Sequence, residues 1–314
     1  AVWRWEHAAD RVPVLCYHRL TAQADLDSGE VVDDEPVWTV VDTDFDAQCR
    51  YLKENGWTTI DLNDMLDIAQ GRRAAPEKPI ILTFDDGYYS VSRLAAPVLE
   101  RYGQTAVVYS CLDPDEHTRA EVKGKDRIMT AEELADLSRR GIAIESHTVT
   151  HCMLTEKSDE DARWELSESR ERLAAITGKP CDHFCVPRGA HDARVVGLVR
   201  EAGYKSCSGL GKGTARLSGD PMKVPRIAVE RHHDVQRFAK ILSPKHASVH
   251  RMLGTLRVFP TRVLGPRLGF QLRSVLYSPA LRPIFGPRNL PRLVLVAAAG
   301  WLGLTVWLTL RVFL

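Results

Sequence analysis

The chain has 314 residues, which is enough for one large domain or two modest ones with a substantial core. Its 42 Lys and Arg nearly balance its 41 Asp and Glu, but every acidic residue lies within residues 1–234, beside 30 basic ones. Residues 235–314 carry 12 basic side chains and no acidic one. The sequence therefore excludes a single domain with evenly distributed charge.

Residues 1–235 alternate strand-like and helix-like segments. Short apolar runs predict strands at residues 12–17, 58–60, 80–82, 105–110, 142–144, 183–186, 204–207 and 224–229. Amphipathic segments predict helices at residues 44–55 (with Thr43 as the N-cap), 62–69, 91–102, 131–140, 159–176, 193–202 and 235–242. Such repeated units predict an α/β fold with a mainly parallel sheet, open or closed into a barrel. Functional side chains in these folds gather at the C-terminal ends of the strands.

Two adjacent carboxylates stand at the end of one predicted strand. The segment TFDDG, residues 83–87, follows the apolar residues 80–82 and contains Asp85 and Asp86. Burying two adjacent carboxylates is costly unless each has a partner, such as a metal ion for one and a proton or cation for the other. A solvated Asp-Asp-Gly turn is the alternative interpretation.

A histidine pair follows another predicted strand. The segment SHTVTH, residues 146–151, contains His147 and His151, which share one face if the chain turns into a helix here. Such a pair alone is more typical of a surface or a helix cap than of a metal site. With one aspartate of the first segment, it forms a two-histidine, one-aspartate set that leaves a position for water, as catalytic zinc sites do. The other aspartate then remains as a base.

These two segments resemble the polysaccharide deacetylase family, also called carbohydrate esterase family four. The segments FCVPRG, residues 184–189, and VLCYH, residues 14–18, support the resemblance, which covers about residues 11–235. It implies a distorted (β/α) barrel and a divalent metal ion, usually Zn²⁺. It also implies a general base at Asp85 and metal ligands at three positions: Asp86, His147 and His151.

Three further site residues follow from the same resemblance. The family draws a backbone N–H for the oxyanion from the residue before the glycine of its third motif, which here is Arg188. Many members have an arginine in that motif to steady the base, but this chain departs from the pattern with Cys185. Arg226, on the predicted strand 224–229, is a candidate for the missing cation, and an ordinary surface ion pair is the alternative. His18 resembles the general acid of related biofilm deacetylases. Two other histidines, His232 and His233, remain alternatives for that role.

The implied activity is that of a metal-dependent hydrolase, with an Asp base and a metal-bound water, which removes N-acetyl groups from amino sugars of a polysaccharide or lipid-linked glycan. One alternative is a deformylase or deacetylase of an undecaprenyl-phosphate-linked amino sugar. Another alternative, from a different class, is a catalytically silent binding or scaffold protein with this fold. The presence of all four Asp and His positions argues against silence.

The C-terminal part predicts membrane association. Residues 293–310 carry no charge and are flanked by Arg292 and Arg311, which is typical of a transmembrane helix. Residues 236–292 interleave arginine with apolar residues and suit an anionic membrane surface better than nucleic acid. Arginines before the span favour a cytoplasmic catalytic domain, residues 1–235, on a bacterial inner membrane. The seven cysteines form no disulfide framework, are interpreted as thiols and agree with a reducing compartment.

Overall fold

The computed structural model describes residues 10–28, 37–114 and 127–243, which all belong to one compact unit of the chain. The strands are β1 Arg11–Val12, β2 Val14–Tyr17, β3 Arg19–Thr21, β4 Thr39–Val41, β5 Thr58–Thr59, β6 Pro79–Phe84, β7 Val107–Ser110, β8 Ala143–Ser146, β9 His183–Cys185, β10 Ser206–Lys212, β11 Ala215–Arg216 and β12 Val224–Ala228. The α-helices are α1 Gln23–Asp27, α2 Asp42–Glu54, α3 Leu62–Ala69, α4 Ala96–Tyr102, α6 Ala131–Arg139, α7 Asp159–Thr177, α8 Ala193–Glu201 and α9 Val235–Ile241.

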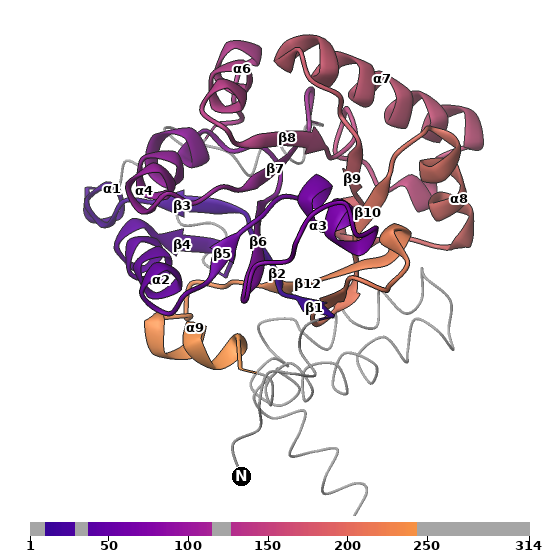
Figure 1. The fold of residues 1–314 in the computed structure, drawn as a ribbon. Coiled ribbons are helices and arrows are strands. Elements are labelled where there is room, and N and C mark those ends of the chain that lie inside the picture. Colours follow the sequence, from indigo (N-terminus) through magenta and orange to yellow (C-terminus); the bar gives the residue numbers. More distant parts are fainter. Residues whose placement is uncertain (1–9, 29–36, 115–126, 244–314) are drawn as a thin grey trace, which may run out of the picture. The chain divides into compact units, whose positions relative to one another are not determined.

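Seven parallel strands close into a barrel in the part of the chain that the structure describes. Their order is β2-β12-β10-β9-β8-β7-β6, and β6 returns to β2 through the register Val14↔Ile81 to Tyr17↔Phe84. The short β5 pairs with the first residues of β6. Figure 1 shows the strands at the centre with helices around them. This arrangement confirms the predicted α/β barrel.

Alternating side chains of each strand fill two separate layers of the core. Val14, Ile81 and Val107 belong to one hydrophobic cluster, whereas their chain neighbours Leu15 and Leu82 belong to another. Successive side chains of a strand point to opposite faces, so both faces of the barrel wall are covered. Strands β2 and β6 accordingly consist of near-continuous apolar runs, as parallel strands buried on both faces do.

Two prolines account for two of the differences from the predicted elements. The predicted strand 12–17 is divided at Pro13, so β1 pairs antiparallel with β11 while β2 joins the barrel. The predicted helix 91–102 begins as a wide π-helical segment, Val91–Ala95, and becomes α4 only at Ala96. Pro97 lacks an N–H, and its ring would clash with the carbonyl four residues earlier in a regular α-helix.

Two other expectations have different outcomes. The helix predicted at 44–55 starts at Asp42 with Val41 as its N-cap, so the prediction that Thr43 caps it is wrong. The predicted transmembrane helix 293–310, and residues 244–292 of the predicted basic segment, lie outside the described residues. Among the residues that are described, no helix has both the length and the apolar character to cross a bilayer.

Candidate active site

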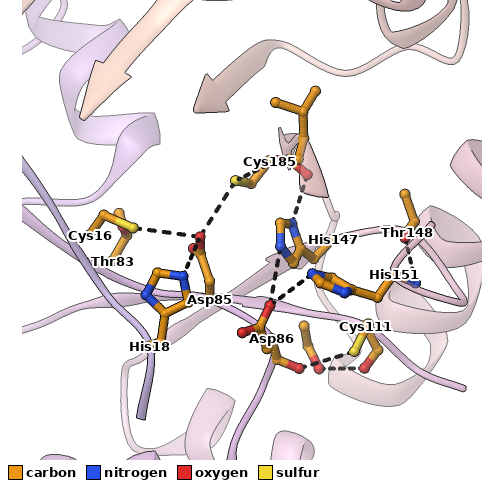
Figure 2. A network of polar contacts seen from close by, with 12 residues as sticks. Cys16, His18, Thr83, Asp85, Asp86, Cys111, His147, Thr148, His151 and Cys185 are labelled. Carbon is orange, nitrogen blue, oxygen red and sulfur yellow. Dashed lines mark hydrogen bonds and ion pairs between the residues drawn. The ribbon is translucent and has the colours of Figure 1, made fainter. Parts of the chain in front are cut away.

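The predicted site residues meet at the C-terminal ends of the barrel strands. Asp85 and Asp86 directly follow β6, and His147 directly follows β8. Cys185 is the last residue of β9, beside β8 in the barrel. Figure 2 shows these side chains gathered in one network, with Asp85 and Asp86 at its centre. The strand ends alone therefore bring together two segments sixty residues apart in the sequence.

The turn after β6 needs an unusual backbone. Asp86 has a φ of 72° and Gly87 a φ of 85°, both in the left-handed region. A Cβ atom at Gly87 would lie 2.4 Å from the Ser110 hydroxyl oxygen at the end of β7. Glycine at this position is thus required both by the conformation and by the close approach of the neighbouring strand. The turn directs the Asp86 carboxylate toward the histidine segment.

The histidine segment is an irregular loop, so the conditional prediction of a helix here is not fulfilled. Thr148 and His151 both have positive φ values, 69° and 62°, and the Thr148 hydroxyl accepts the N–H of His151 at 2.9 Å. These two left-handed residues shape the loop in which both imidazoles lie next to Asp86. Non-glycine residues with positive φ store strain, which is typical of functional sites.

Asp86, His147 and His151 form a candidate metal centre. The Nε2 atoms of His147 and His151 lie 3.4 Å and 3.1 Å from the same Asp86 oxygen, Oδ1. The Nδ1 atom of His147 lies 2.8 Å from the carbonyl oxygen of Cys185, so Nδ1 carries the proton and donates it. In the neutral ring, the Nε2 lone pair then faces a carboxylate oxygen. Three buried acceptors facing one another fit a cation between them.

The pKa shifts of Asp86 and His151 also suit a cation bound at this centre. Burial opposes the charge of Asp86, but the close contacts with His147 and His151 hold its pKa well below the usual value. Burial likewise opposes protonation of His151, but contact with Asp86 raises the pKa of that imidazole. The site therefore stabilises positive charge beside an ionised carboxylate. It consists of the ligand types that Zn²⁺ prefers.

A buried carboxylate of α7 holds the histidine loop, and sequence reasoning missed it. Glu165, only 3% exposed, accepts hydrogen bonds from the N–H of Val149 at 2.8 Å and from the N–H of Thr150 at 3.0 Å. It also accepts the Thr150 hydroxyl at 2.5 Å. Glu165 lies on a highly charged helix, so its sequence context gives no sign that this one carboxylate turns inward.

Asp85 is clamped by Arg226, from β12. The guanidinium donates from Nη1 to Oδ1 and from Nη2 to Oδ2, both at 2.6 Å. It also donates to the Thr83 hydroxyl at 3.0 Å and contacts the Cys185 sulfur at 3.0 Å. Burial opposes the charge of Asp85, but Arg226 outweighs it and lowers the pKa of the carboxyl. The structure thus brings a cation from another strand to the carboxylate beside Cys185.

His18 also approaches Asp85. Its Nε2 lies 4.0 Å from Asp85 Oδ2, and its ring packs against Trp38 with 4.7 Å between the ring centroids. Burial lowers the pKa of His18, so the imidazole is neutral at pH 7. His232 and His233 lie in the turn after β12, where both contact Glu230: His232 Nδ1 is 3.3 Å from its carboxylate, and His233 accepts its N–H.

Arg188 lies in a 3₁₀ turn, Pro187–Gly189, just after β9. Its φ is 56°, so it is one of four non-glycine residues with positive φ in the described ranges, together with Asp86, Thr148 and His151. Its side chain is exposed, and its charge opposes protonation of His151. The roles assigned to Arg188, His18, Arg226 and the other site residues stay predictions.

Comparison with known proteins points to one family. A family model described as polysaccharide deacetylase matches residues 72–207, which contain Asp85, Asp86, His147 and His151. A Bacillus subtilis (strain 168) protein named "Putative polysaccharide deacetylase YxkH" is 22% identical over 205 residues, covering 65% of this chain and 66% of the relative. The poly-beta-1,6-N-acetyl-D-glucosamine N-deacetylase of Escherichia coli (strain K12) is 24% identical over 242 residues, covering 66% of this chain and 36% of the relative.

A solved structure supports the fold. The Streptococcus pyogenes deacetylase PplD, in complex with acetate, has a TM-score of 0.64 to this chain at 18% identity, covering 74% of this chain and 99% of that one. The match thus spans nearly the whole of that chain, but just under two thirds of the first sequence relative and about a third of the second. His18 and Arg226 lie outside the range of the family model.

Proposed function

Residues 72–207 match the polysaccharide deacetylase family model, and on this premise we propose that the chain is a metal-dependent hydrolase that removes N-acetyl groups from amino sugars of a glycan. The observation that carries the proposal is the convergence of Asp86, His147 and His151 on one point, with Asp85 adjacent in the chain. An acetamide is a poor electrophile, so its hydrolysis at neutral pH needs both a Lewis acid and a base.

The three residues Asp86, His147 and His151 would hold a divalent cation, with Zn²⁺ the best match to their donor types. When bound, the ion would polarise the acetamide carbonyl and lower the pKa of a water molecule. The hydrogen bond from His147 Nδ1 to the Cys185 carbonyl fixes the tautomer that presents Nε2. Such a second partner orients the ring and strengthens it as a ligand.

Asp85 would act as the general base. A base must be ionised at the working pH, and Arg226 keeps the pKa of Asp85 low despite its burial. The same guanidinium holds both carboxylate oxygens in place, so Arg226 is a positioning residue. This bidentate contact replaces the arginine that many family members carry at the position of Cys185. The backbone N–H of Arg188 would stabilise the oxyanion.

His18 would act as the general acid. Because burial lowers its pKa, His18 is neutral before turnover and must receive the proton that it later donates. Asp85 is the nearest source, with Oδ2 at 4.0 Å from His18 Nε2. A proton taken from water by Asp85 would pass to His18 and then to the departing amine. This route uses one proton and restores both residues to their starting states.

A lipid-linked amino sugar is the second candidate substrate, with a formyl or an acetyl group to be removed. The observation that favours it is the sequence of residues 236–310, whose basic and apolar character predicts attachment to an anionic bacterial inner membrane. A membrane-attached catalytic domain would meet lipid-linked sugars at high local concentration. The curated Escherichia coli relative is named for a polymer substrate, which favours the polymer.

The test is release of acetate or formate by the full-length, zinc-loaded protein. Substrates are oligomers of β-1,6-N-acetylglucosamine, chito-oligosaccharides and an undecaprenyl-phosphate-linked N-acylated amino sugar. We expect Asp85→Asn to retain zinc and to lose about 10²–10⁴-fold in kcat. His147→Ala should lose both zinc and turnover. Full activity of Asp85→Asn would remove Asp85 from the base role, and stoichiometric zinc without acyl release from any substrate would favour a silent binding protein.

A further inference from the structure

A second cluster of potential ligands shares Asp85 with the site described above. Cys16 Sγ lies 3.6 Å from Asp85 Oδ2, and His18 Nε2 lies 4.0 Å from the same oxygen. Potential ligand atoms of these three residues all lie within 4.8 Å of one another. In Figure 2, Cys16 and His18 lie on the opposite side of Asp85 from His147 and His151. The cluster is therefore adjacent to the Asp86 centre but uses different ligands.

The chemistry of this cluster suits a thiophilic divalent cation. A thiolate, an imidazole and a carboxylate are all ligands of Zn²⁺, and the sulfur adds preference for a softer ion such as Cd²⁺. Cys16 is 7% exposed, whereas the His18 side chain is 21% exposed, so an ion has access from the His18 side. His18 Nδ1 is buried without a hydrogen-bond partner among the described residues, and packing against Trp38 fixes the ring.

Two contacts make this a weak site. Arg226 already binds both oxygens of Asp85, so an ion must share Oδ2 with a guanidinium. Burial raises the pKa of the Cys16 thiol well above its usual range, so the thiol must lose its proton when the ion binds. Both effects cost affinity relative to the Asp86 centre, whose three ligand atoms face one another. The second cluster is expected to fill only after the first.

We propose that Cys16, His18 and Asp85 form a second, inhibitory site for a thiophilic divalent cation, such as Zn²⁺ in excess or Cd²⁺. On binding, the Cys16 S–H bond breaks, a sulfur–metal bond forms, and the proton leaves to solvent. The bound ion occupies Asp85 and His18, which then cannot exchange a proton. The inhibition rests on the proposed function, whereas occupancy of the site does not.

The test loads the full-length protein with one equivalent of Zn²⁺ and then titrates it with Cd²⁺. Two properties are followed together: the ultraviolet sulfur-to-cadmium charge-transfer band and the metal content after equilibrium dialysis. The wild-type protein should gain the band with a second equivalent of metal and lose at least 90% of any acyl-release activity. Cys16→Ala should keep one equivalent of metal, lack the band and resist inhibition. If Cys16→Ala does not fold, judged by thermal unfolding, then Cys16→Ser takes its place.

Two control variants test whether the Cys16 sulfur, rather than another buried thiol, binds the ion. Cys49→Ala removes a buried thiol of α2, and the band and second equivalent should remain. Cys185→Ala removes the other thiol near Asp85, 3.9 Å from Oδ2. Loss of the band in Cys185→Ala but not in Cys16→Ala would overturn the proposal, as would an unchanged band in every variant. If no acyl release is found for any substrate, the proposed function fails while the band and the metal count still decide the second site.

Discussion

Asp85 receives donors on both of its carboxylate oxygens. Arg226 binds Oδ1 and Oδ2, and the Cys16 and Cys185 thiols approach Oδ2 at 3.6 Å and 3.9 Å. Burial raises the pKa of both thiols, which therefore stay protonated and are able to donate. A carboxylate held this way remains ionised in a buried site. The efficiency of Asp85 as a general base then depends more on its position than on its basicity.

The first residue-level prediction concerns Arg226→Lys. Lysine keeps the charge but loses the planar two-point contact, so Asp85 should be less well positioned. We expect kcat to fall about 10²-fold, with zinc retained. Because Arg226 lowers the pKa of Asp85, a weaker contact should shift the acid limb of the kcat–pH profile to higher pH. Arg216→Lys, at exposed Arg216 on β11, is the control. An unchanged rate and acid limb would show that Arg226 does not serve the base.

The second residue-level prediction compares two glycines with similar backbone angles. Gly56 has a φ of 72° and open space where a Cβ atom would lie, whereas Gly87 has a φ of 85° and faces Ser110. Alanine at Gly56 should cost about 1–2 kcal/mol of unfolding free energy, from the left-handed conformation alone. Alanine at Gly87 should cost a further ~1–3 kcal/mol from the clash. Urea unfolding measures both, and equal costs would contradict the close approach.

At the level of elements, α7 supports the metal centre through one side chain. The predicted helix 159–176 appears as α7 at Asp159–Thr177, with Ser158 as N-cap and left-handed Gly178 as C-cap. Its inward-facing Glu165 binds the histidine loop through two backbone N–H groups and one hydroxyl. The loop has no regular structure of its own, so these bonds replace the ladder that a strand or helix would provide.

We therefore predict that Glu165→Gln weakens metal binding. The glutamine amide can accept only through its oxygen, so at least one loop group loses its acceptor. Zinc affinity, measured by competition with a chelator, should fall about 10–100-fold, while far-UV circular dichroism stays unchanged. Glu171→Gln, at an exposed position of the same helix, should match the wild type. Equal affinities for both variants would show that Glu165 does not position the ligands.

The strand ends could be predicted from the sequence, and Arg226 was a candidate partner of the base, but the contacts that shape the histidine loop could not be predicted. The apolar runs before Asp85 and His147 are local signals, and parallel strands bring their ends to one edge. The imidazole geometry depends instead on left-handed Thr148 and His151, and this conformation is too uncommon in residues other than glycine to be predicted from their types. Glu165 and Cys16 reach the site only through helix and strand packing, so no local pattern marks them. The seven cysteines are buried thiols, as predicted.

For the whole molecule, the separation of charge predicts two parts with different environments. The acidic part contains the barrel, and its last described helix, α9, packs Phe238 against Tyr51 of α2 at 6.1 Å between ring centroids. The basic part has no acidic residue to offset its arginines. Such a segment is attracted to anionic lipid by roughly 1 kcal/mol per basic residue near the surface. The core of the barrel is already buried by the barrel's own strands and helices and does not depend on a lipid surface.

The corresponding prediction concerns the span 293–310. The full-length protein should float with vesicles of anionic phospholipid in a density gradient and remain with them in high salt. Ala298→Lys combined with Leu304→Lys should abolish salt-resistant flotation, because each lysine near the centre of a span costs about 2.5–3.5 kcal/mol. Arg311→Lys is the matched control and should float. Salt-resistant flotation of the double variant would contradict a transmembrane helix at these residues.

The most direct test of the account is to locate the ion. Crystals of the protein loaded with one equivalent of Zn²⁺, measured on both sides of the zinc absorption edge, give the metal position independently of activity. We predict one strong anomalous peak at about 2.0–2.2 Å from a carboxylate oxygen of Asp86 and from Nε2 of both His147 and His151. A zinc peak bound by other residues, with these three side chains left without metal, would contradict the assigned centre and the mechanism built on it.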